Sequence, residues 1–306
     1  MTSRQAEYII AMYREGSVTK AASKLNVSQP ALSQCIRVAE KDIGAEIFVK
    51  NKSPLTLTYA GEKYYEIALE MLRLEENLHL EIKDLHQEQA GKLSFGISML
   101  RGATYLPSIL NRYEATHPKV NVKISEIGSH ACFSAVQNGD VDLGILSVDK
   151  VSQKVLAMEP LCKDKVYIMA GPKSHLANRY KSGTEVSASV LQSTPVVEIK
   201  EGHGLYQIQV RIFSTLANPP IIKYEIESVV LGTKLVEATD ALMLCPYSVL
   251  GTLMTKNLSV YPLKESIFSN TVCIGYRHDK YIPRYMREFI DIVKEEISEE
   301  KIPVVN

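Results

Sequence analysis

The segment from Ser17 to Ile43 constrains the chain most, because its pattern is that of two short helices joined by a tight turn. Ser17 and Ser28 each precede a run with helical apolar spacing, and their hydroxyls can cap those helices. Asn26 suits the turn, since asparagine tolerates a positive φ better than most residues. Pro30 falls in the first turn of the second helix, where a missing N–H costs nothing. The segment therefore predicts a helix-turn-helix whose second helix enters the major groove of DNA.

The second helix of this motif has an apolar face and a polar face. We expect its apolar stripe to be buried, and the stripe consists of Leu32, Cys35, Ile36, Ala39 and Ile43. The opposite side carries Pro30, Gln34, Arg37 and Lys41, with Ser33 beside them. Glutamine can pair with adenine, arginine with guanine or phosphate, and serine with either. A solvated amphipathic helix without a DNA role would show the same two faces.

The residues that follow favour the DNA-binding interpretation. An apolar anchor, Ile47–Val49, leads into a basic turn with Lys50 and Lys52, and a second extended run covers residues 55–58. A basic turn between two short extended runs is typical of a β-hairpin wing. We therefore expect DNA contacts from the start and outer face of the second helix and from the wing. These residues are Ser28, Gln29, Pro30, Ser33, Gln34, Arg37, Lys50 and Lys52.

The run AASKLNVSQPALSQCIRVAEKDIGAEIFVKNKSPLTLTYAG closely resembles the amino-terminal domain of LysR-type transcriptional regulators. The shared pattern is AA-x-x-L-x-[VI]-SQPA-[LV]-S-x-x-I, then E-x-x-[LI]-G-x-x-[LI]-F, a basic wing and LT-x-x-G. The resemblance implies a sequence-specific regulator of transcription that is controlled by a small-molecule effector and needs no cofactor. It also implies that the chain binds double-stranded operator or promoter DNA and forms a homodimer or tetramer. RNA polymerase is a further implied partner.

The charge distribution agrees with a DNA-binding head. The chain of 306 residues has no formal net charge overall. Residues 1–58, however, carry eight Lys and Arg against five Asp and Glu, whereas residues 59–90 carry three against eight. Only the first segment is modestly basic, as a local phosphate-binding surface requires.

The sequence shows no membrane, secretion or metal signal. No stretch resembles a signal peptide, and no run of 18 apolar residues is present, so we expect a cytoplasmic protein without a membrane partner. The cysteines are odd in number and have no CxxC spacing, which favours reduced core thiols over disulfides or a metal site. An oxidant-sensing pair of Cys132 and Cys162 is the alternative.

Residues from 59 to about 90 have the features of a long linker helix. Glycine is absent after Gly61, proline is absent, and apolar residues recur at spacings close to a heptad seam. The seam consists of Ile67, Met71, Leu74, Leu78, Ile82 and Leu85. A two-stranded coiled coil would bury this stripe and make the chain a dimer. The alternative is a helix that lies on its own chain.

From Gly91 onward, strands and helices alternate at lengths that predict βαβ units and a mainly parallel sheet. The runs THPKVNVKI and VQNGDVDLGIL resemble the LysR-type effector domain, which is similar to periplasmic solute-binding proteins. The expected fold is thus α/β, with a winged helix-turn-helix head, a linker helix and two α/β lobes. The expected boundaries are 1–58 for the head, 59–90 for the linker, 91–306 for the effector domain, 91–163 with 265–306 for lobe I, and 164–264 for lobe II.

A ligand is expected between the two lobes. In parallel sheets, ligands bind beyond the carboxyl ends of strands, where helix N-termini present free N–H groups to anions. Together with the resemblance, this points to a small anionic metabolite. The expected contacts are Ser98, Met99, Leu100, Arg101, Ser147, Gly202, His203 and Gly204. A strand-end serine can instead be a helix cap, and the Gly-His-Gly run can be a simple turn.

Two other classes of protein fit the α/β part less well. An enzyme in the cleft could use Ser98, Asp142 and His203, but the GxSxG, GKS-type, HExxH and GxGxxG motifs are all missing. We therefore expect no catalytic residues. A solute-binding protein is opposed by the missing signal segment and by the DNA-binding head.

Overall fold

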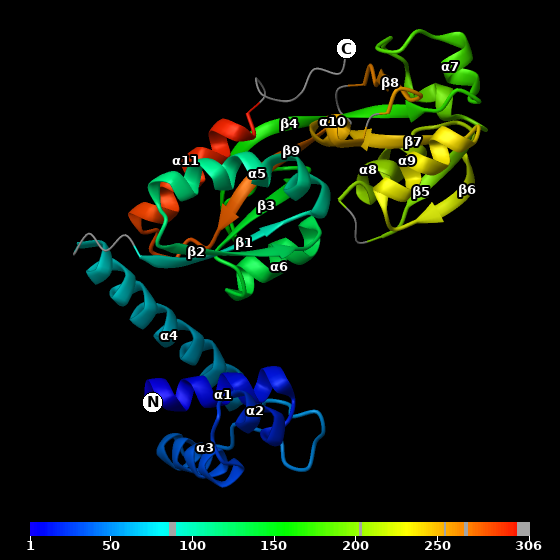
Figure 1. The fold of residues 1–306 in the computed structure, drawn as a ribbon. Coiled ribbons are helices and arrows are strands. Elements are labelled where there is room, and N and C mark those ends of the chain that lie inside the picture. The colour runs from blue at the N-terminus through cyan, green and yellow to red at the C-terminus, as the bar shows by residue number, and fades with distance from the viewer. Residues whose placement is uncertain (86–89, 202–203, 254, 266–268, 299–306) are drawn as a thin grey trace. The chain divides into compact units, whose positions relative to one another are not determined.

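The computed structural model describes residues 1–85, 90–201, 204–253, 255–265 and 269–298. Its contacts divide the chain into two compact units, each described by itself below (Figure 1). Unit 1 is formed by residues 1–87 with 279–281, and unit 2 by residues 88–278 with 282–306.

Within its described residues, unit 1 contains four helices: α1 (Ser3–Glu15), α2 (Val18–Lys24), α3 (Gln29–Ile43) and α4 (Tyr59–Leu85). The expected caps are confirmed. The Ser17 hydroxyl accepts a hydrogen bond from Lys20 N at 3.5 Å, and the Ser28 hydroxyl accepts one from Ala31 N at 3.3 Å. Asn26, between α2 and α3, has a φ of 54°. The local capping and turn chemistry therefore forms the helix-turn-helix as the sequence predicts.

The apolar stripe of α3 is shorter than expected. Leu32, Ile36 and Ala39 are buried in a core that also holds residues of α1, α2 and α4. Cys35 is only half-buried, and Ile43 is 43% exposed, so its predicted burial is wrong. The cause is the end of the helix: Gly44 caps α3 with a φ of 72°, and the chain turns away before Ile43 can reach the core.

The wing is simpler than the predicted hairpin. Its two arms meet at a single antiparallel bridge between Phe48 and Leu57, and the residues between them form turns. Val49 N donates to Thr56 O at 2.9 Å, and Thr58 N donates to Ile47 O at 2.9 Å. The Ile47 amide in turn donates to the Glu40 carboxylate on α3 at 2.9 Å. These bonds fix the base of the wing against the helix-turn-helix.

Lobe I of unit 2 begins with two βα segments and a third strand in chain order. They are β1 (Gly91–Ile97), α5 (Met99–Thr116), β2 (Val120–Glu126), α6 (Ser129–Asn138) and β3 (Leu143–Val148). The chain returns to this lobe through β9 (Ser269–Tyr276) and α11 (Arg284–Glu296). The pairing of β9 with β3 confirms the expected crossing back. The buried rings of Phe95, Tyr113 and Phe289 meet edge to face at the centre of the lobe.

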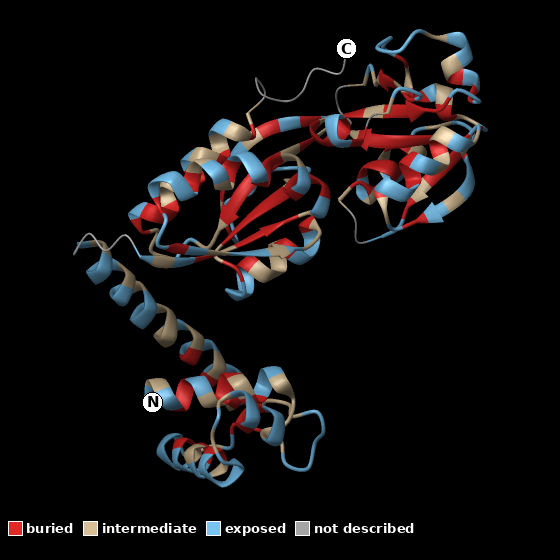
Figure 2. Ribbon diagram, viewed as in Figure 1, coloured by how far each residue is buried: buried red, intermediate tan, exposed pale blue. Residues whose placement is uncertain are grey.

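Lobe II holds the remaining elements, except that the first half of β4 pairs with β9 of lobe I. They are β4 (Ala157–Ala170), α7 (His175–Arg179), η1 (Ala188–Leu191), β5 (Pro195–Ile199), α8 (Tyr206–Ser214), β6 (Ile221–Ile226), α9 (Val229–Ala238), β7 (Leu242–Pro246), η2 (Tyr247–Val249), α10 (Leu250–Leu253) and β8 (Ser259–Pro262). Figure 2 shows that burial concentrates on the strands, while the outer faces of the covering helices are exposed.

The sheet is mixed, which corrects the expectation of a mainly parallel one. Its strand order is β2-β1-β3-β9-β4-β7-β5-β6, with β8 beside β4. The β1 pairs and the β5 pairs are parallel, whereas every pair made by β4 or β9 is antiparallel. The first half of β4 pairs with β9 and its second half with β7 and β8. One long strand thus belongs to both lobes.

Candidate functional sites

The outer face of α3 is accessible, as the DNA-binding hypothesis requires. Gln34, Arg37 and Lys41 are exposed, and Ser33 is half-buried. Within the part of the chain that the structure describes, Arg37 makes no ion pair. Ser28, Gln29 and Pro30 are exposed at the start of the helix. The structure therefore leaves a row of polar and cationic side chains open to a partner.

Two residues of this surface also have structural roles. The Gln29 side chain accepts a hydrogen bond from the Thr19 hydroxyl at 3.4 Å, which joins α3 to α2. In the wing, Lys50 forms an ion pair with Glu46, and this contact raises the pKa of Lys50. Lys52 is exposed and makes no ion pair among the described residues. Lys52 is thus the wing cation whose charge is most available to a phosphate.

A cleft between the two lobes of unit 2 contains three adjoining hollows. Cavity 1 has a volume of about 230 Å³, and cavity 2 has a volume of about 640 Å³. A neck of about 30 Å³ shares Ser98, Arg101 and Gly128 with cavity 1 and Ser129, Ser147, Gly204 and Asn270 with cavity 2.

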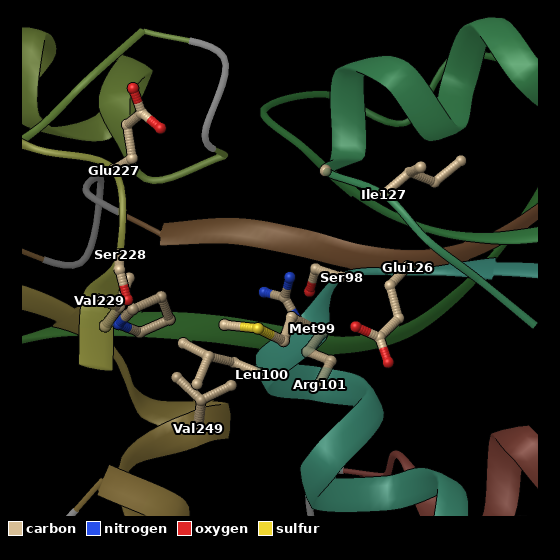
Figure 3. Close-up of a pocket in the computed structure, with 12 residues that line it drawn as sticks. Ser98, Met99, Leu100, Arg101, Glu126, Ile127, Glu227, Ser228, Val229 and Val249 are labelled. Atoms are coloured by element: carbon tan, nitrogen blue, oxygen red, sulfur yellow. The ribbon is translucent and has the colours of Figure 1, made fainter. Parts of the chain in front are cut away.

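The structure brings six of the eight expected effector contacts to this cleft. Ser98, Met99, Leu100 and Arg101 line cavity 1, and Figure 3 shows them at the start of α5. Ser147 and Gly204 line cavity 2 and the neck. The other two expected contacts, Gly202 and His203, lie outside the described residues.

Arg101 is the most unusual side chain in the cleft, because it is charged and only 9% exposed. Its Nη2 donates to Asp164 Oδ2 on β4 at 2.7 Å. Asp164 also accepts hydrogen bonds from the Ser248 amide at 2.9 Å and from the Ser248 hydroxyl at 2.6 Å. The Arg101 Nε is buried without a hydrogen-bond partner. A buried donor without a partner costs about 1–3 kcal/mol, so the guanidinium keeps one unsatisfied N–H inside the protein.

The start of α5 adds further donors beside Arg101. Ser98 is the N-cap residue, but its hydroxyl makes no capping hydrogen bond. The first N–H groups of an α-helix have no partner within the helix, and they carry the positive end of its dipole. Leu100, in the same turn, packs into the core of lobe II although α5 belongs to lobe I. A ligand at this turn would therefore contact the boundary of the two lobes.

A polar chain crosses the cleft at cavity 2. The Ser147 amide donates to the Ser129 hydroxyl at 3.2 Å, and the Ser147 hydroxyl accepts from the Asn270 amide at 3.1 Å. Asn270 Oδ1 accepts from Arg211 Nη2 on α8 at 3.0 Å, and Arg211 also forms an ion pair with Asp149. The α8 helix of lobe II is thus connected to the end of β3 in lobe I.

Sequence reasoning missed several lining residues, and they differ in the signal they leave. Gly128–Ser129 and Glu227–Ser228 each follow a strand and precede a helix, which is the same signal that pointed to Ser98. Asp164 and Asn270 lie within β4 and β9, where no local pattern distinguishes them from other polar strand residues.

The structure weakens the alternative roles that were considered for single residues. Asp142 accepts hydrogen bonds from the amide and the hydroxyl of Ser94, each at 2.7 Å, and so has a structural role. Cys132 and Cys162 lie in different core clusters, and burial raises the pKa of Cys132 to about 12.

Among the described residues, no group of His, Cys, Asp and Glu side chains is arranged to hold a metal ion. No described helix has the length and apolar character that crossing a bilayer requires.

Comparison with known proteins assigns both parts of the chain to one family. Residues 3–62 match the bacterial regulatory helix-turn-helix protein model of the lysR family, and residues 86–298 match the LysR substrate binding domain. The chain is 26% identical over 280 residues to the transcriptional regulator BenM of Acinetobacter baylyi, an alignment that covers 91% of this chain and 90% of BenM.

Solved structures show the same fold. Full-length OxyR from Pseudomonas aeruginosa has a TM-score of 0.71 at 20% identity, with both chains fully covered. CbnR in complex with its target DNA has a TM-score of 0.58 at 18% identity, covering 96% of this chain and 99% of that one. The chain belongs to the LysR family of transcriptional regulators, with a helix-turn-helix DNA-binding domain and an effector-binding domain.

Proposed function

We propose that this regulator reads its operator with the exposed row on α3 and responds to an effector seated at the start of α5. The head would comprise residues 1–58, the linker 59–90 and the effector domain 91–306, with lobes at 91–163 with 265–306 and at 164–264. The observation that carries the effector part is the cavity of about 230 Å³ at the start of α5, whose lining includes the uncapped Ser98 and the charged, nearly buried Arg101. Contact with RNA polymerase belongs to the same proposal.

The DNA part of the proposal rests on accessible side chains of suitable chemistry. Gln34 and Arg37 are exposed on α3, one turn from each other. Ser28, the N-cap residue of that helix, is also exposed. Such side chains read base edges, while the wing lysine Lys52 would contact phosphate. The relative CbnR has been solved in complex with its target DNA, which supports the same use of the head here.

Arg37→Ala is expected to weaken operator binding about 5- to 150-fold, because one good arginine contact to a base contributes about 1–3 kcal/mol. The measurement is a gel shift or anisotropy titration, at fixed salt, on DNA upstream of the protein's own gene. Arg179→Ala removes another exposed arginine, from lobe II, and should leave the affinity unchanged. Undiminished binding by Arg37→Ala would contradict the assignment of this face.

The linker helix supports a dimer. In the single chain, five of the six seam residues of α4 are open: Ile67, Leu74, Leu78, Ile82 and Leu85 are between 42% and 77% exposed. The sixth, Met71, is half-buried against the core of the head. Exposed apolar residues at heptad spacing on one helix are buried when a second helix pairs with it. We propose that the chain dimerises through this seam and that a second contact between dimers makes a tetramer.

Replacing Leu74 and Leu78 with glutamate should reduce the oligomer by one step, from tetramer to dimer or from dimer to monomer. Burial of each leucine contributes about 1.5–3 kcal/mol to the stability of the interface. Each position would be buried in both chains of the dimer, so each substitution acts twice. Sedimentation velocity at several protein concentrations measures the change. Glu75→Gln and Glu76→Gln change exposed residues of the same helix turn and serve as controls. An unaltered assembly in the double leucine variant would rule out the seam as an interface.

A further inference from the structure

A short segment between β9 and α11 belongs to unit 1, although the chain on both sides of it belongs to unit 2. Residues 279–281 group with residues 1–87 by their contacts, whereas the chain up to His278 and from Ile282 onward groups with the α/β unit. The hydrogen bonds and ion pairs that place the segment in unit 1 are made with the linker helix α4. We call residues 279–281 the clasp.

Asn77 on α4 binds the backbone of the clasp with both polar atoms of its side-chain amide. Its Nδ2 donates to the carbonyl oxygen of Asp279 at 2.6 Å, and its Oδ1 accepts from the Tyr281 amide at 3.0 Å. Between these two residues, the Lys280 Nζ lies 3.7 Å from the Glu76 carboxylate, and the Lys280 side chain is only 8% exposed. Because one amide binds two backbone groups at a fixed separation, Asn77 sets the position of the clasp along the helix.

Contacts on either side of Asn77 extend the attachment over about three turns of α4. Arg73 forms an ion pair with Asp279, about one turn before Asn77. The Tyr281 hydroxyl donates to Asp84 Oδ2 at 2.9 Å, about two turns after Asn77. The clasp is thus held at both of its ends and in its middle.

The clasp occupies a different face of α4 from the seam. From residue 73 to the end of α4, four residues are half-buried and every other residue is exposed: Arg73, Asn77, Leu80 and Asp84. Their spacing of four, three and four residues places them on one side of the helix. Arg73, Asn77 and Asp84 each precede a seam leucine, so the two faces lie about 100° apart around the helix. The clasp therefore leaves the seam open to a second chain.

The strand that leads into the clasp begins at the effector cleft. Asn270, near the start of β9, lines cavity 2 and the neck, and it forms hydrogen bonds with Ser147 and Arg211. β9 pairs with β3 on one side and with β4 on the other (Figure 1). Two residues separate β9 from the clasp, and two more separate the clasp from α11. Links this short leave little slack, so a displacement of β9 reaches the clasp.

Resting on the proposed effector site, we propose that the clasp couples the effector cleft to the linker helix. A ligand that shifts β9 would change the hold of the clasp on α4, and operator binding at the head would change β9 in return. Coupling between two binding sites is reciprocal, so either ligand reports on it. The chain also runs directly from α4 into β1, and that connection is the alternative route. Coupling through the clasp differs from it by requiring Asn77.

Hydrogen exchange of the full chain, with and without saturating DNA from upstream of the protein's own gene, tests the coupling without an effector. In the parent, the DNA should change exchange in β9 and at the start of α11. In Asn77→Ala, this response should fall by at least about half, although the DNA is still bound. Without DNA, residues 74–85 of the variant should exchange about five-fold faster or more, because two hydrogen bonds are lost.

Two further variants separate the clasp from general effects on the helix. His79→Ala places the same good helix former at an exposed position of α4, so it should preserve the response of β9 and should not speed up exchange in α4. Tyr281→Phe removes only the hydrogen bond to Asp84, and it should reduce the response of β9 less than Asn77→Ala does.

An equal response of β9 in the parent and in Asn77→Ala would overturn the inference and assign the coupling to the connection between α4 and β1. Absence of any response in the parent would overturn it as well. The gel shift used for Arg37→Ala confirms that the DNA is bound in each sample, so a failed DNA-binding role is detected separately. Because the experiment uses no small molecule, its outcome is also independent of whether an effector binds the cleft.

Discussion

Replacing Asp164 with alanine should lower the free energy of unfolding of the α/β unit by about 3–5 kcal/mol, because it breaks a buried ion pair on one side only. Asp164 is 2% exposed and Arg101 is 9% exposed at their side chains. The variant leaves the Arg101 charge buried without its carboxylate, and it removes the acceptor of the Ser248 amide and hydroxyl. Hydrogen exchange of the full chain, followed by mass spectrometry, measures the loss segment by segment.

A second Asp–Arg pair in the same cleft provides the control. Asp149 pairs with Arg211, but its side chain is 61% exposed, so Asp149→Ala should cost no more than about 1 kcal/mol. Replacing Arg101 by methionine and Asp164 by leucine together should recover most of the loss, because no unpaired charge then remains. Equal effects of Asp164→Ala and Asp149→Ala would show that burial does not govern the pair.

Local chemistry explains why so much of the fold could be predicted from the sequence. Serine caps, an asparagine turn and helical apolar spacing act within a few residues, so they appear directly in the sequence around Ser17, Asn26 and Ser28. The same reasoning predicted the alternation of strands and helices that the two lobes show from Gly91 onward. It also placed Ser98 and Ser147 at strand ends, where they do line the cleft.

The parts that could not be predicted depend on partners far away in the chain. The antiparallel course of β4 and β9 follows from pairing between strands about a hundred residues apart, and no local pattern records it. The ion pair of Arg101 with Asp164 and the bond of Asn270 to Ser147 arise in the same way. These contacts determine which charged groups of the cleft are already paired. The strand ends and helix starts, which the sequence shows, therefore do not by themselves determine the charge of the ligand that the cleft suits.

One motif noted in the sequence gains its physical reason only in the structure. The pattern LT-x-x-G corresponds to Leu57, Thr58 and Gly61. The Thr58 hydroxyl accepts a hydrogen bond from the Gly61 amide at 2.9 Å, at the start of α4. A Cβ added at Gly61 would lie 2.0 Å from the carbonyl oxygen of Ile47 and 2.9 Å from its carbonyl carbon. Glycine at this position therefore lets the linker helix approach the backbone at the base of the wing.

Gly61→Ala should destabilise the head by about 3 kcal/mol, at the upper end of the cost of overpacking, because backbone atoms rather than a flexible side chain must move. Ile47 is fully buried and its carbonyl already accepts from Thr58 N at 2.9 Å, so the wing base cannot shift without losing contacts. Hydrogen exchange in α1, α2 and α3 should become faster while that of the α/β unit is unchanged, and operator affinity should fall with it.

Gly102→Ala makes the same chemical change inside α5, where the nearest atom to the added Cβ is a leucine methyl at 3.4 Å. Alanine is also the better helix former, so this control should not be destabilised. If the head of Gly61→Ala exchanged as slowly as that of the parent, the close approach of α4 to Ile47 would not be what holds the linker helix against the DNA-binding head. The recognition helix would then be positioned by its packing on α1 and α2 alone.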